Sequence, residues 1–282
     1  VLGDTHFDRW PDQTYHNGYH HKNARKEAHV REVFARNHQM WEDRMRRLLR
    51  RAASLIQEDT RMAIQLGDLI QGDTQDGPTH TRYLDDAYCH IRGALGGIPL
   101  VTVAGNHDIR GVDGEAAERA YTEYMTGRMS QALGKPVEKT CFSFWIGRDA
   151  YIAIDFSRPD DAEIDRMLDQ TEGARHTFVL IHAPLLPYQN VENGNWIIHG
   201  RDAGDEARRH LRRRLAQRHA IVLCGHTHNT EFAVWEGDGG RITQMTMSSV
   251  WATDENGVYT ERWSRAEDYC HSAIERGGEE VR

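Results

Sequence analysis

The chain has 282 residues, of which 39% are hydrophobic and 28% are charged, with 7 prolines and a formal net charge of -8. This composition is typical of a folded globular protein and excludes a disordered or collagen-like chain; no apolar run approaches the ~18 residues of a membrane-spanning helix. The acidic balance argues against a broad surface for nucleic-acid backbone, although it leaves room for a local cationic site.

Helical and strand-like segments alternate along the first part of the chain. Residues 23–57 carry apolar side chains at a spacing near 3.6, which predicts one long amphipathic helix or two in tandem. The apolar run 62–66 has strand length, and Pro78 suits the first turn of a helix that ends near Gly96. The run 98–104 is again of strand length, so the order is helix, strand, helix, strand.

The second half of the chain is richer in strands. It contains two predicted hairpins, 141–146 with 151–154 and 231–235 with 241–247. The strand-like runs 177–181 and 220–224 enclose a helix that Asp202 can cap, and residues 264–275 are expected to form a short helix in the polar tail.

This order of elements predicts the fold class. Strands that alternate with helices form largely parallel sheets covered by helices, and ligands of such folds collect beyond the carboxyl ends of the strands. Because the second half adds hairpins, we expect an α/β fold of two packed mixed β-sheets flanked by helices. We find no linker or repeat, so residues 1–282 are expected to form a single domain, with 250–282 as a C-terminal extension packed on it.

The first residue is Val1, without an initiator methionine, and the first residues resemble the end of a strand. We therefore expect that further residues preceded Val1. A secretory signal could have stood there, so the sequence fits either a cytoplasmic protein or an exported one. It indicates no oligomeric state.

Side chains that commonly bind metals follow five of the expected strands. The segments are Asp4-Thr5-His6, Gly67-Asp68, Gly105-Asn106-His107-Asp108, His182, and Gly225-His226-Thr227-His228. Carboxylate, imidazole and amide oxygen together form a nitrogen and oxygen environment suited to Mn, Fe or Zn rather than a thiolate site. The four cysteines are scattered without a C-x-x-C pair, so they indicate neither a zinc ribbon nor a disulfide framework.

The spacing of these side chains favours convergence on one cleft. In extended backbone, residues i and i+2 project to the same side, so Asp4 with His6, and His226 with His228, can each present two ligands. Two metal ions ~3.5 to 4 Å apart need a bridging carboxylate, and Asp68, isolated after its strand, is the natural candidate. The sequence therefore predicts a site for two neighbouring ions.

The ordered series D-x-H, G-D, G-N-H-D, a single H and G-H-x-H resembles the motif series of the calcineurin-like metallophosphoesterase superfamily. The series extends from Asp4 to His228, which is about four fifths of the chain. Each motif alone would mean little, whereas the order and the position at strand ends make the match specific. The resemblance implies a four-layer α-β-β-α sandwich with a dinuclear metal centre.

The resemblance also implies a role for each motif residue. The cofactor would be two divalent or trivalent metal ions, namely Mn, Fe or Zn. The first ion would be held by Asp4, His6 and His228, the second by Asn106, His182 and His226, and both by Asp68. Asn106 and His107 would contact the substrate, and His107 would protonate the leaving oxygen, with Asp108 as the charge partner that raises its pKa.

The implied activity is hydrolysis of a small phosphomonoester or phosphodiester. A water that bridges the two metals would yield a hydroxide at neutral pH and attack phosphorus in line, while the metals, Asn106 and His107 neutralise the phosphoryl charge. The alternative is a non-catalytic scaffold of the same fold for protein interaction. Such scaffolds typically lose metal ligands or the catalytic histidine, whereas this chain retains both.

Two loops are candidates for substrate contact. His20 lies in the histidine-rich stretch 15–21, and Trp196 lies in the loop 185–201 that follows His182. Either loop could equally be a solvated surface segment.

Other patterns are interpreted as structural. Asp155 follows a strand but has no partner motif, and Cys224 precedes the Gly225 turn within an apolar run, which is typical of packing. The arginines between 208 and 214 describe the solvent face of an ordinary helix.

Overall fold

The structure, a computed structural model, describes residues 1–8, 24–111, 113–186, 205–228, 230–237 and 239–250. Several expectations lie outside these residues: substrate contact by His20 and Trp196, the helix cap at Asp202, and the C-terminal extension beyond Val250.

Six strands form the larger of two sheets, in the order β3-β4-β5-β6-β8-β7. They are β3 (Phe142–Ile146), β4 (Asp149–Ile154), β5 (His176–Ile181), β6 (Ile221–Cys224), β7 (Glu231–Gly237) and β8 (Gly240–Thr246). Strands β4, β5, β6 and β8 run parallel, whereas β3 and β7 pair antiparallel with β4 and β8. Both predicted hairpins are confirmed, and they make this sheet mixed.

The smaller sheet consists of β1 (Ala63–Gln65) and β2 (Leu100–Thr102), which run parallel. Leu2 forms a parallel bridge with Gln65, so the start of the chain lies beside β1. Further parallel bridges join Phe7 to Ile70 and Thr74 to Gly111 beyond the carboxyl ends of these strands. The loops that carry the first three motifs therefore leave the same edge of the sheet.

Five helices lie within the described residues: α2 (Ala24–Ala53), α3 (Gly77–Ala94), α4 (Gly114–Leu133), α5 (Asp161–Asp169) and α6 (Asp205–Gln217). The long helical pattern forms one continuous helix, α2. Helix α3 begins as predicted, because Asp76 caps it by accepting a hydrogen bond from the backbone N–H of Thr79, and Pro78 lies in its first turn. Helices α4 and α5 were not among the predicted elements.

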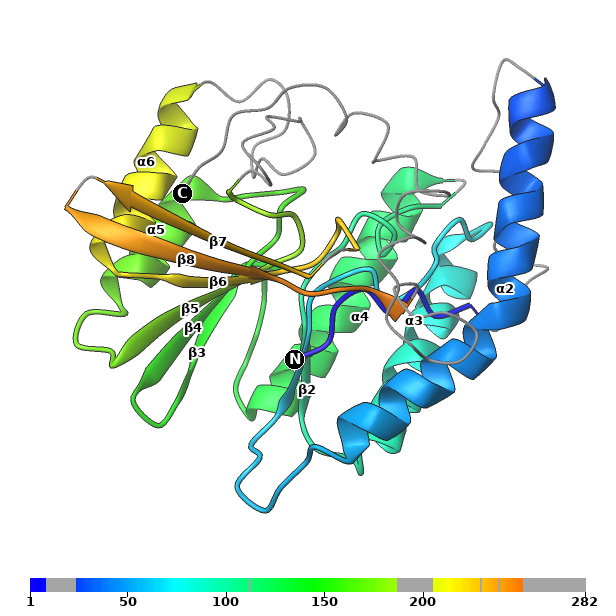
Figure 1. The fold of residues 1–282 in the computed structure, drawn as a ribbon, viewed down its shortest axis with the longest axis horizontal. Coiled ribbons are helices and arrows are strands. Elements are labelled where there is room, and N and C mark those ends of the chain that lie inside the picture. The colour runs from blue at the N-terminus through cyan, green and yellow to red at the C-terminus, as the bar shows by residue number, and fades with distance from the viewer. Residues whose placement is uncertain (9–23, 112, 187–204, 229, 238, 251–282) are drawn as a thin grey trace.

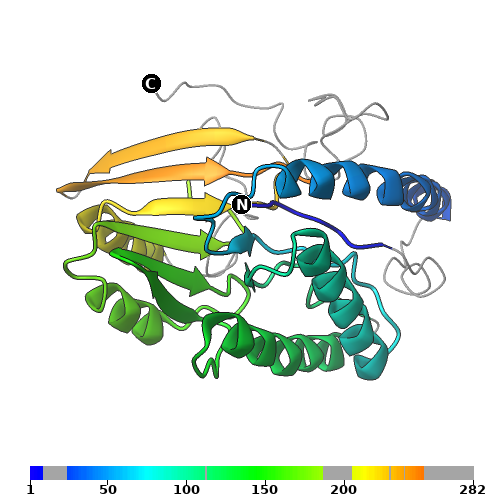
Figure 2. The same ribbon diagram turned by 90° about the horizontal axis from the view of Figure 1, so that it is seen from below.

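Two hydrophobic cores hold the layers together. The first joins buried side chains of α2, α3 and α4 to the small sheet and to one face of the larger sheet, where Phe144, Leu180 and Leu223 contribute. The second packs α5 and α6 against the other face, through residues such as Ile181 and Leu215. Figures 1 and 2 show this order of helices, small sheet, large sheet and helices, which is the predicted α-β-β-α sandwich.

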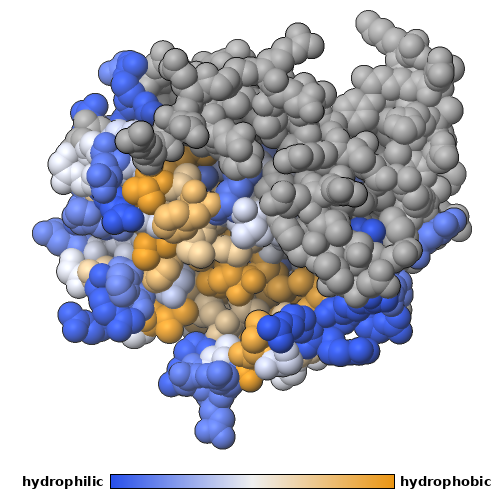
Figure 3. All heavy atoms as spheres, viewed as in Figure 1, coloured by the Kyte–Doolittle hydropathy of each residue, from blue (hydrophilic) through white to orange (hydrophobic). Residues whose placement is uncertain are grey.

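Figure 3 shows apolar side chains gathered near the middle of this side of the molecule, with hydrophilic residues around its lower and left margins. Rings of Phe144, Tyr151 and Phe178 stack across neighbouring strands, with centroids 4.9 and 4.8 Å apart.

Among the described residues, no helix combines the length and hydrophobicity needed to cross a membrane.

Candidate metal centre

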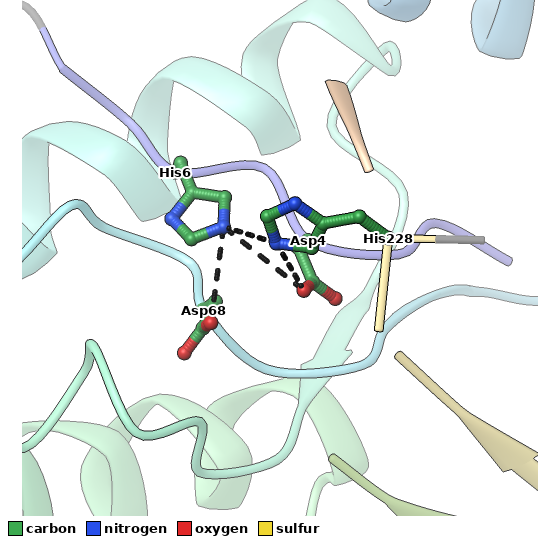
Figure 4. Close-up of side chains that lie close together, drawn as sticks. All are labelled: Asp4, His6, Asp68 and His228. Atoms are coloured by element: carbon green, nitrogen blue, oxygen red, sulfur yellow. Dashed lines mark hydrogen bonds and ion pairs between the residues drawn. The ribbon is translucent and has the colours of Figure 1, made fainter. Parts of the chain in front are cut away.

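The predicted ligands meet at the carboxyl ends of the parallel strands and form two clusters. Asp4, His6, Asp68 and His228 form the first, which Figure 4 shows, and Asp68, His182 and His226 form the second. Within each cluster, one ligand atom from every residue lies within 4.8 Å of the others. Asp68 belongs to both clusters, which is the position expected of a bridging carboxylate.

The ligand atoms of the first cluster lie at distances that suit a shared cation. Nε2 of His6 is 3.0 Å from Nε2 of His228, and Nε2 of His228 is 3.1 Å from Oδ2 of Asp4. Oδ2 of Asp68 lies 3.8 Å from Nε2 of His6. Nitrogen and oxygen ligands sit ~2.0 to 2.2 Å from a divalent ion, which spaces them ~3 Å or slightly more from one another.

Asn106 adds an amide oxygen to the second cluster. Its Oδ1 lies 3.0 Å from Nε2 of His182 and 2.9 Å from Nδ1 of His226. Those two ring nitrogens are 3.2 Å apart, and Nε2 of His182 is 3.3 Å from Oδ2 of Asp68. An amide oxygen and a carboxylate oxygen only accept hydrogen bonds, so this convergence of lone pairs fits a bound metal cation.

Backbone hydrogen bonds fix the two carboxylates. The N–H of His226 donates to both oxygens of Asp4 at 3.0 Å, and the N–H of His107 donates to Oδ1 of Asp68 at 2.8 Å. Each bond leaves the remaining lone pairs for an ion and joins one ligand loop to another.

The buried carboxylates and imidazoles shift one another's pKa. Burial opposes ionisation of Asp68, but the neighbouring histidines outweigh it and hold its pKa well below the usual range. Burial lowers the pKa of His182, whereas the Asp68 and Asp4 carboxylates outweigh it and raise the pKa to about 9. In the metal-free protein His182 therefore carries a proton at neutral pH, and a metal ion must displace it.

Four of the ligand residues have left-handed backbone. The φ angles are 40° at His6, 51° at Asp68, 72° at His226 and 58° at His228. Residues other than glycine pay on the order of 1 kcal/mol for this conformation, which is retained where the surroundings over-determine it, often at functional sites. The side chains of all four residues belong to the ligand clusters.

Glycines beside the ligands allow the loops to approach one another closely. A Cβ on Gly105 would lie 2.0 Å from the backbone nitrogen of Asp68, and one on Gly225 would lie 2.1 Å from Oδ1 of Asp4. The glycines of the G-D, G-N-H-D and G-H-x-H motifs thus provide space for a ligand from another loop as well as a sharp turn.

His107 and Asp108 do not form the predicted pair. The half-buried ring of His107 lies beside His6, with centroids 4.6 Å apart, and its Nδ1 is 2.8 Å from the carbonyl oxygen of Gln71. The carboxylate of Asp108 instead accepts hydrogen bonds from the backbone N–H of Ile70 at 3.1 Å and of Gly105 at 2.9 Å. The expectation that Asp108 is the charge partner of His107 is therefore wrong.

The pKa directions agree with this correction. Burial, with a contribution from Asp68, raises the pKa of Asp108 to about 8, so this group is a poor countercharge. Burial and then Arg110 lower the pKa of His107 to about 3, so its ring is neutral at neutral pH in the free protein. Asp108 ties the loop after β1 to the loop after β2, which is a structural role.

Asp155 and Cys224 have the structural surroundings expected of them. Oδ1 of Asp155 accepts hydrogen bonds from the backbone N–H groups of Ser157 and Arg158 and from the Ser157 hydroxyl. Cys224 is fully buried, and burial raises its thiol pKa.

Gln65 is a positioning residue that the sequence interpretation missed. Its side-chain amide donates to the carbonyl oxygen of Gly3 at 3.3 Å, accepts from the N–H of Gly67 at 3.2 Å, and accepts from the hydroxyl of Thr102. Gln65 thereby links the loops of Asp4 and Asp68 to strand β2. The signal was a polar side chain within the otherwise apolar run 62–66.

Similarity to known proteins identifies the family of this chain. The family model of calcineurin-like phosphoesterases matches residues 1–230, and no curated protein matches the chain. Among matching solved structures, sulfate thiohydrolase SoxB of Thermus thermophilus, in complex with glycerol, shows a TM-score of 0.39 and 15% identity over 73% of this chain. The aligned part covers 38% of that protein, so the chain spans about two fifths of its length. Because the family model covers most of the sequence, the chain belongs to the calcineurin-like phosphoesterase family.

Proposed function

We propose that the protein is a metal-dependent phosphoesterase that hydrolyses small phosphomonoesters or phosphodiesters at a centre of two metal ions. The observation that carries the proposal is the place of Asp68, whose carboxylate belongs to both ligand clusters. Mn, Fe and Zn all accept the nitrogen and oxygen donors of these clusters. When bound, the two ions would lower the pKa of a shared water and neutralise charge on the phosphoryl group.

The first task of the protein's own residues is to hold the phosphoryl group. The amide of Asn106 and the ring of His107 follow each other in one loop, and His107 lies beside the first cluster through its contact with His6. A phosphoryl group placed over both clusters would meet these two side chains. Fixed donors directed at charge that develops in the transition state are among the largest contributions to such catalysis.

The second task is proton transfer to the leaving group. Because the Gln71 carbonyl accepts from Nδ1, Nε2 of His107 is the nitrogen left to face substrate. The negative phosphoryl group raises the pKa of the neighbouring imidazole, so the ring takes up a proton when substrate binds. The oxygen of a water would then bond to phosphorus and release a proton to solvent as the ester P–O bond breaks. The leaving oxygen takes the Nε2 proton, and solvent returns a proton to Nε2.

Metal analysis combined with a hydrolysis assay tests the proposed function. Protein purified without chelator is expected to hold two ions per chain and to hydrolyse nitrophenyl phosphate, bis-nitrophenyl phosphate or both. Removing the ions by dialysis against chelator should abolish hydrolysis, and adding Mn, Zn or Fe should restore it. The reason is that the positive charge of the ions lowers the pKa of water and neutralises the phosphoryl group. Metal-loaded protein that is inert on both compounds and on a panel of nucleotides, cyclic nucleotides and sugar phosphates would instead indicate a non-catalytic scaffold.

A further inference from the structure

Arg110 lies beside the His107 ring. It is neither one of the metal ligands nor one of the residues proposed to touch substrate. Nη2 of Arg110 is 2.9 Å from Nδ1 of His107 and 2.7 Å from Oδ2 of Asp73. The same nitrogen donates to the carbonyl oxygen of Gln71 at 3.4 Å, and this oxygen is also the partner of His107 Nδ1 at 2.8 Å. One guanidinium nitrogen therefore meets the histidine, its acceptor and a buried carboxylate.

Backbone contacts join the same two loops. The N–H of Asp73 donates to the carbonyl oxygen of Arg110 at 2.8 Å, and Thr74 forms a parallel bridge with Gly111. Gly72 allows this approach, because a Cβ there would lie 2.3 Å from the carbonyl oxygen of His107. These contacts join the loop after β1 to the loop after β2 next to His107.

The ion pair with buried Asp73 holds Arg110 in a fixed position. Asp73 is 3% exposed and has left-handed backbone, with φ 58°. Removing the guanidinium would leave a buried carboxylate without its cation, which proteins tolerate poorly. The side chain of Arg110 is 27% exposed, whereas that of its partner Asp73 is 4% exposed.

We propose that Arg110, anchored by Asp73, is a positioning residue that holds the His107 imidazole against the Gln71 carbonyl with Nε2 facing the substrate. This role rests on the proposed function of His107. Nδ1 carries the proton that it donates to the Gln71 carbonyl at 2.8 Å, so turning the ring over would lose this bond. Nη2 of Arg110 lies 2.9 Å from Nδ1 and donates to Asp73 and to the same Gln71 carbonyl, so it holds the acceptor of the ring in place. Ring orientation matters because a misplacement of ~1 Å in a reacting group costs up to ~100-fold in rate.

A double-mutant cycle with His107→Ala tests whether Arg110 acts through His107. In the otherwise unchanged protein, Arg110→Met is expected to lower kcat on nitrophenyl phosphate roughly 10- to 100-fold with little change in KM and in metal content. In the His107→Ala background the same change should cause no further loss, because the ring that Arg110 positions is gone. Arg110→Lys, which keeps the charge next to Asp73, should retain more activity than Arg110→Met.

Arg128→Met is the matched control. Arg128 also pairs with an aspartate, Asp85, and is also 27% exposed, but it lies on α4 away from the ligand clusters. This variant should keep kcat, whichever histidine background carries it. An equal loss from Arg110→Met with and without His107 would overturn the proposal, since Arg110 would then act on substrate or on folding alone. No loss in either background would overturn it too.

A spectroscopic measurement separates this inference from the proposed function. In zinc-loaded protein with 15N-labelled histidine, the His107 ring, identified by its absence in His107→Ala, should show one tautomer with the proton on Nδ1. Arg110→Met should shift or broaden these signals, and Arg128→Met should leave them unchanged. If the wild-type protein hydrolyses no phosphoester, the proposed function fails. The His107 signals of the wild-type protein and of Arg110→Met still show whether Arg110 positions the ring. An unchanged His107 spectrum in Arg110→Met would refute it.

Discussion

Replacing Asp68 with Asn is expected to weaken both metal sites at once, so that the purified variant holds clearly fewer than two ions per chain. The reason is that Asp68 is the ligand common to both clusters, with Oδ2 3.3 Å from His182 Nε2 and 3.8 Å from His6 Nε2. An amide oxygen has the same shape as the carboxylate oxygen but lacks its negative charge. We expect kcat/KM to fall at least ~100-fold, since even indirect disturbance of a ligand costs that much.

Asp155→Asn provides a matched control for this experiment. Asp155 is also a buried aspartate at the carboxyl end of a parallel strand, but its carboxylate caps the turn at Ser157 and belongs to neither ligand cluster. This variant should retain two ions and full activity on nitrophenyl phosphate. Metal stoichiometry that stays at two in Asp68→Asn would show that the bridging assignment is wrong.

Replacing His107 with Ala is expected to lower kcat by ~100- to 10,000-fold, the usual contribution of a positioned proton donor. Metal content should stay near that of the wild-type protein, because the contacts of the His107 ring are with Gln71, Arg110 and the edge of His6. The loss should be larger for phenyl phosphate than for nitrophenyl phosphate, since a poor leaving group needs the proton more.

The contrasting variant is His182→Ala. His182 belongs to the second cluster and lies 3.3 Å from the shared carboxylate, so its removal should lower metal content as well as activity. If His107→Ala lost as much metal as His182→Ala, then His107 would belong with the ligands, and its proposed role in proton transfer would have to be abandoned.

The ligand clusters were predictable because two features of the sequence identify metal ligands. These features are the residue type and the position directly after an apolar run. Asp4, Asp68 and His182 each follow a segment of strand length, and parallel strands bring their carboxyl ends to one edge. The left-handed backbone of His6, Asp68, His226 and His228 could not be predicted, because aspartate and histidine adopt it more often than most residues but still only at a minority of positions.

Asp108 was misread for a physical reason. Consecutive residues after a strand project in different directions, so proximity in sequence placed His107 and Asp108 together although their side chains diverge. The partner of the His107 ring is a backbone carbonyl, that of Gln71, and every residue has one. Such a contact has no sequence signature.

Helix α4 was missed because its buried face is weakly apolar. The residues that it buries are Ala117, Ala120, Tyr121, Met125 and Met129, so two of the five are small alanines and one carries a polar hydroxyl. The start of α4 has a clearer signal in the sequence, because Asp113 is a common helix-capping residue. In the structure it accepts a hydrogen bond from the N–H of Ala116. The fold class was nevertheless predictable, because the alternating strands and the two hairpins fix the sheet order more than any single helix does.

The central claim is that two metal ions share Asp68, and anomalous scattering tests it most directly. Crystals grown with manganese should show two anomalous peaks ~3.5 to 4 Å apart, one on each side of the Asp68 carboxylate. The first should lie among Asp4, His6 and His228, and the second among Asn106, His182 and His226. A single peak, or peaks that leave Asp68 without contact, would contradict the account.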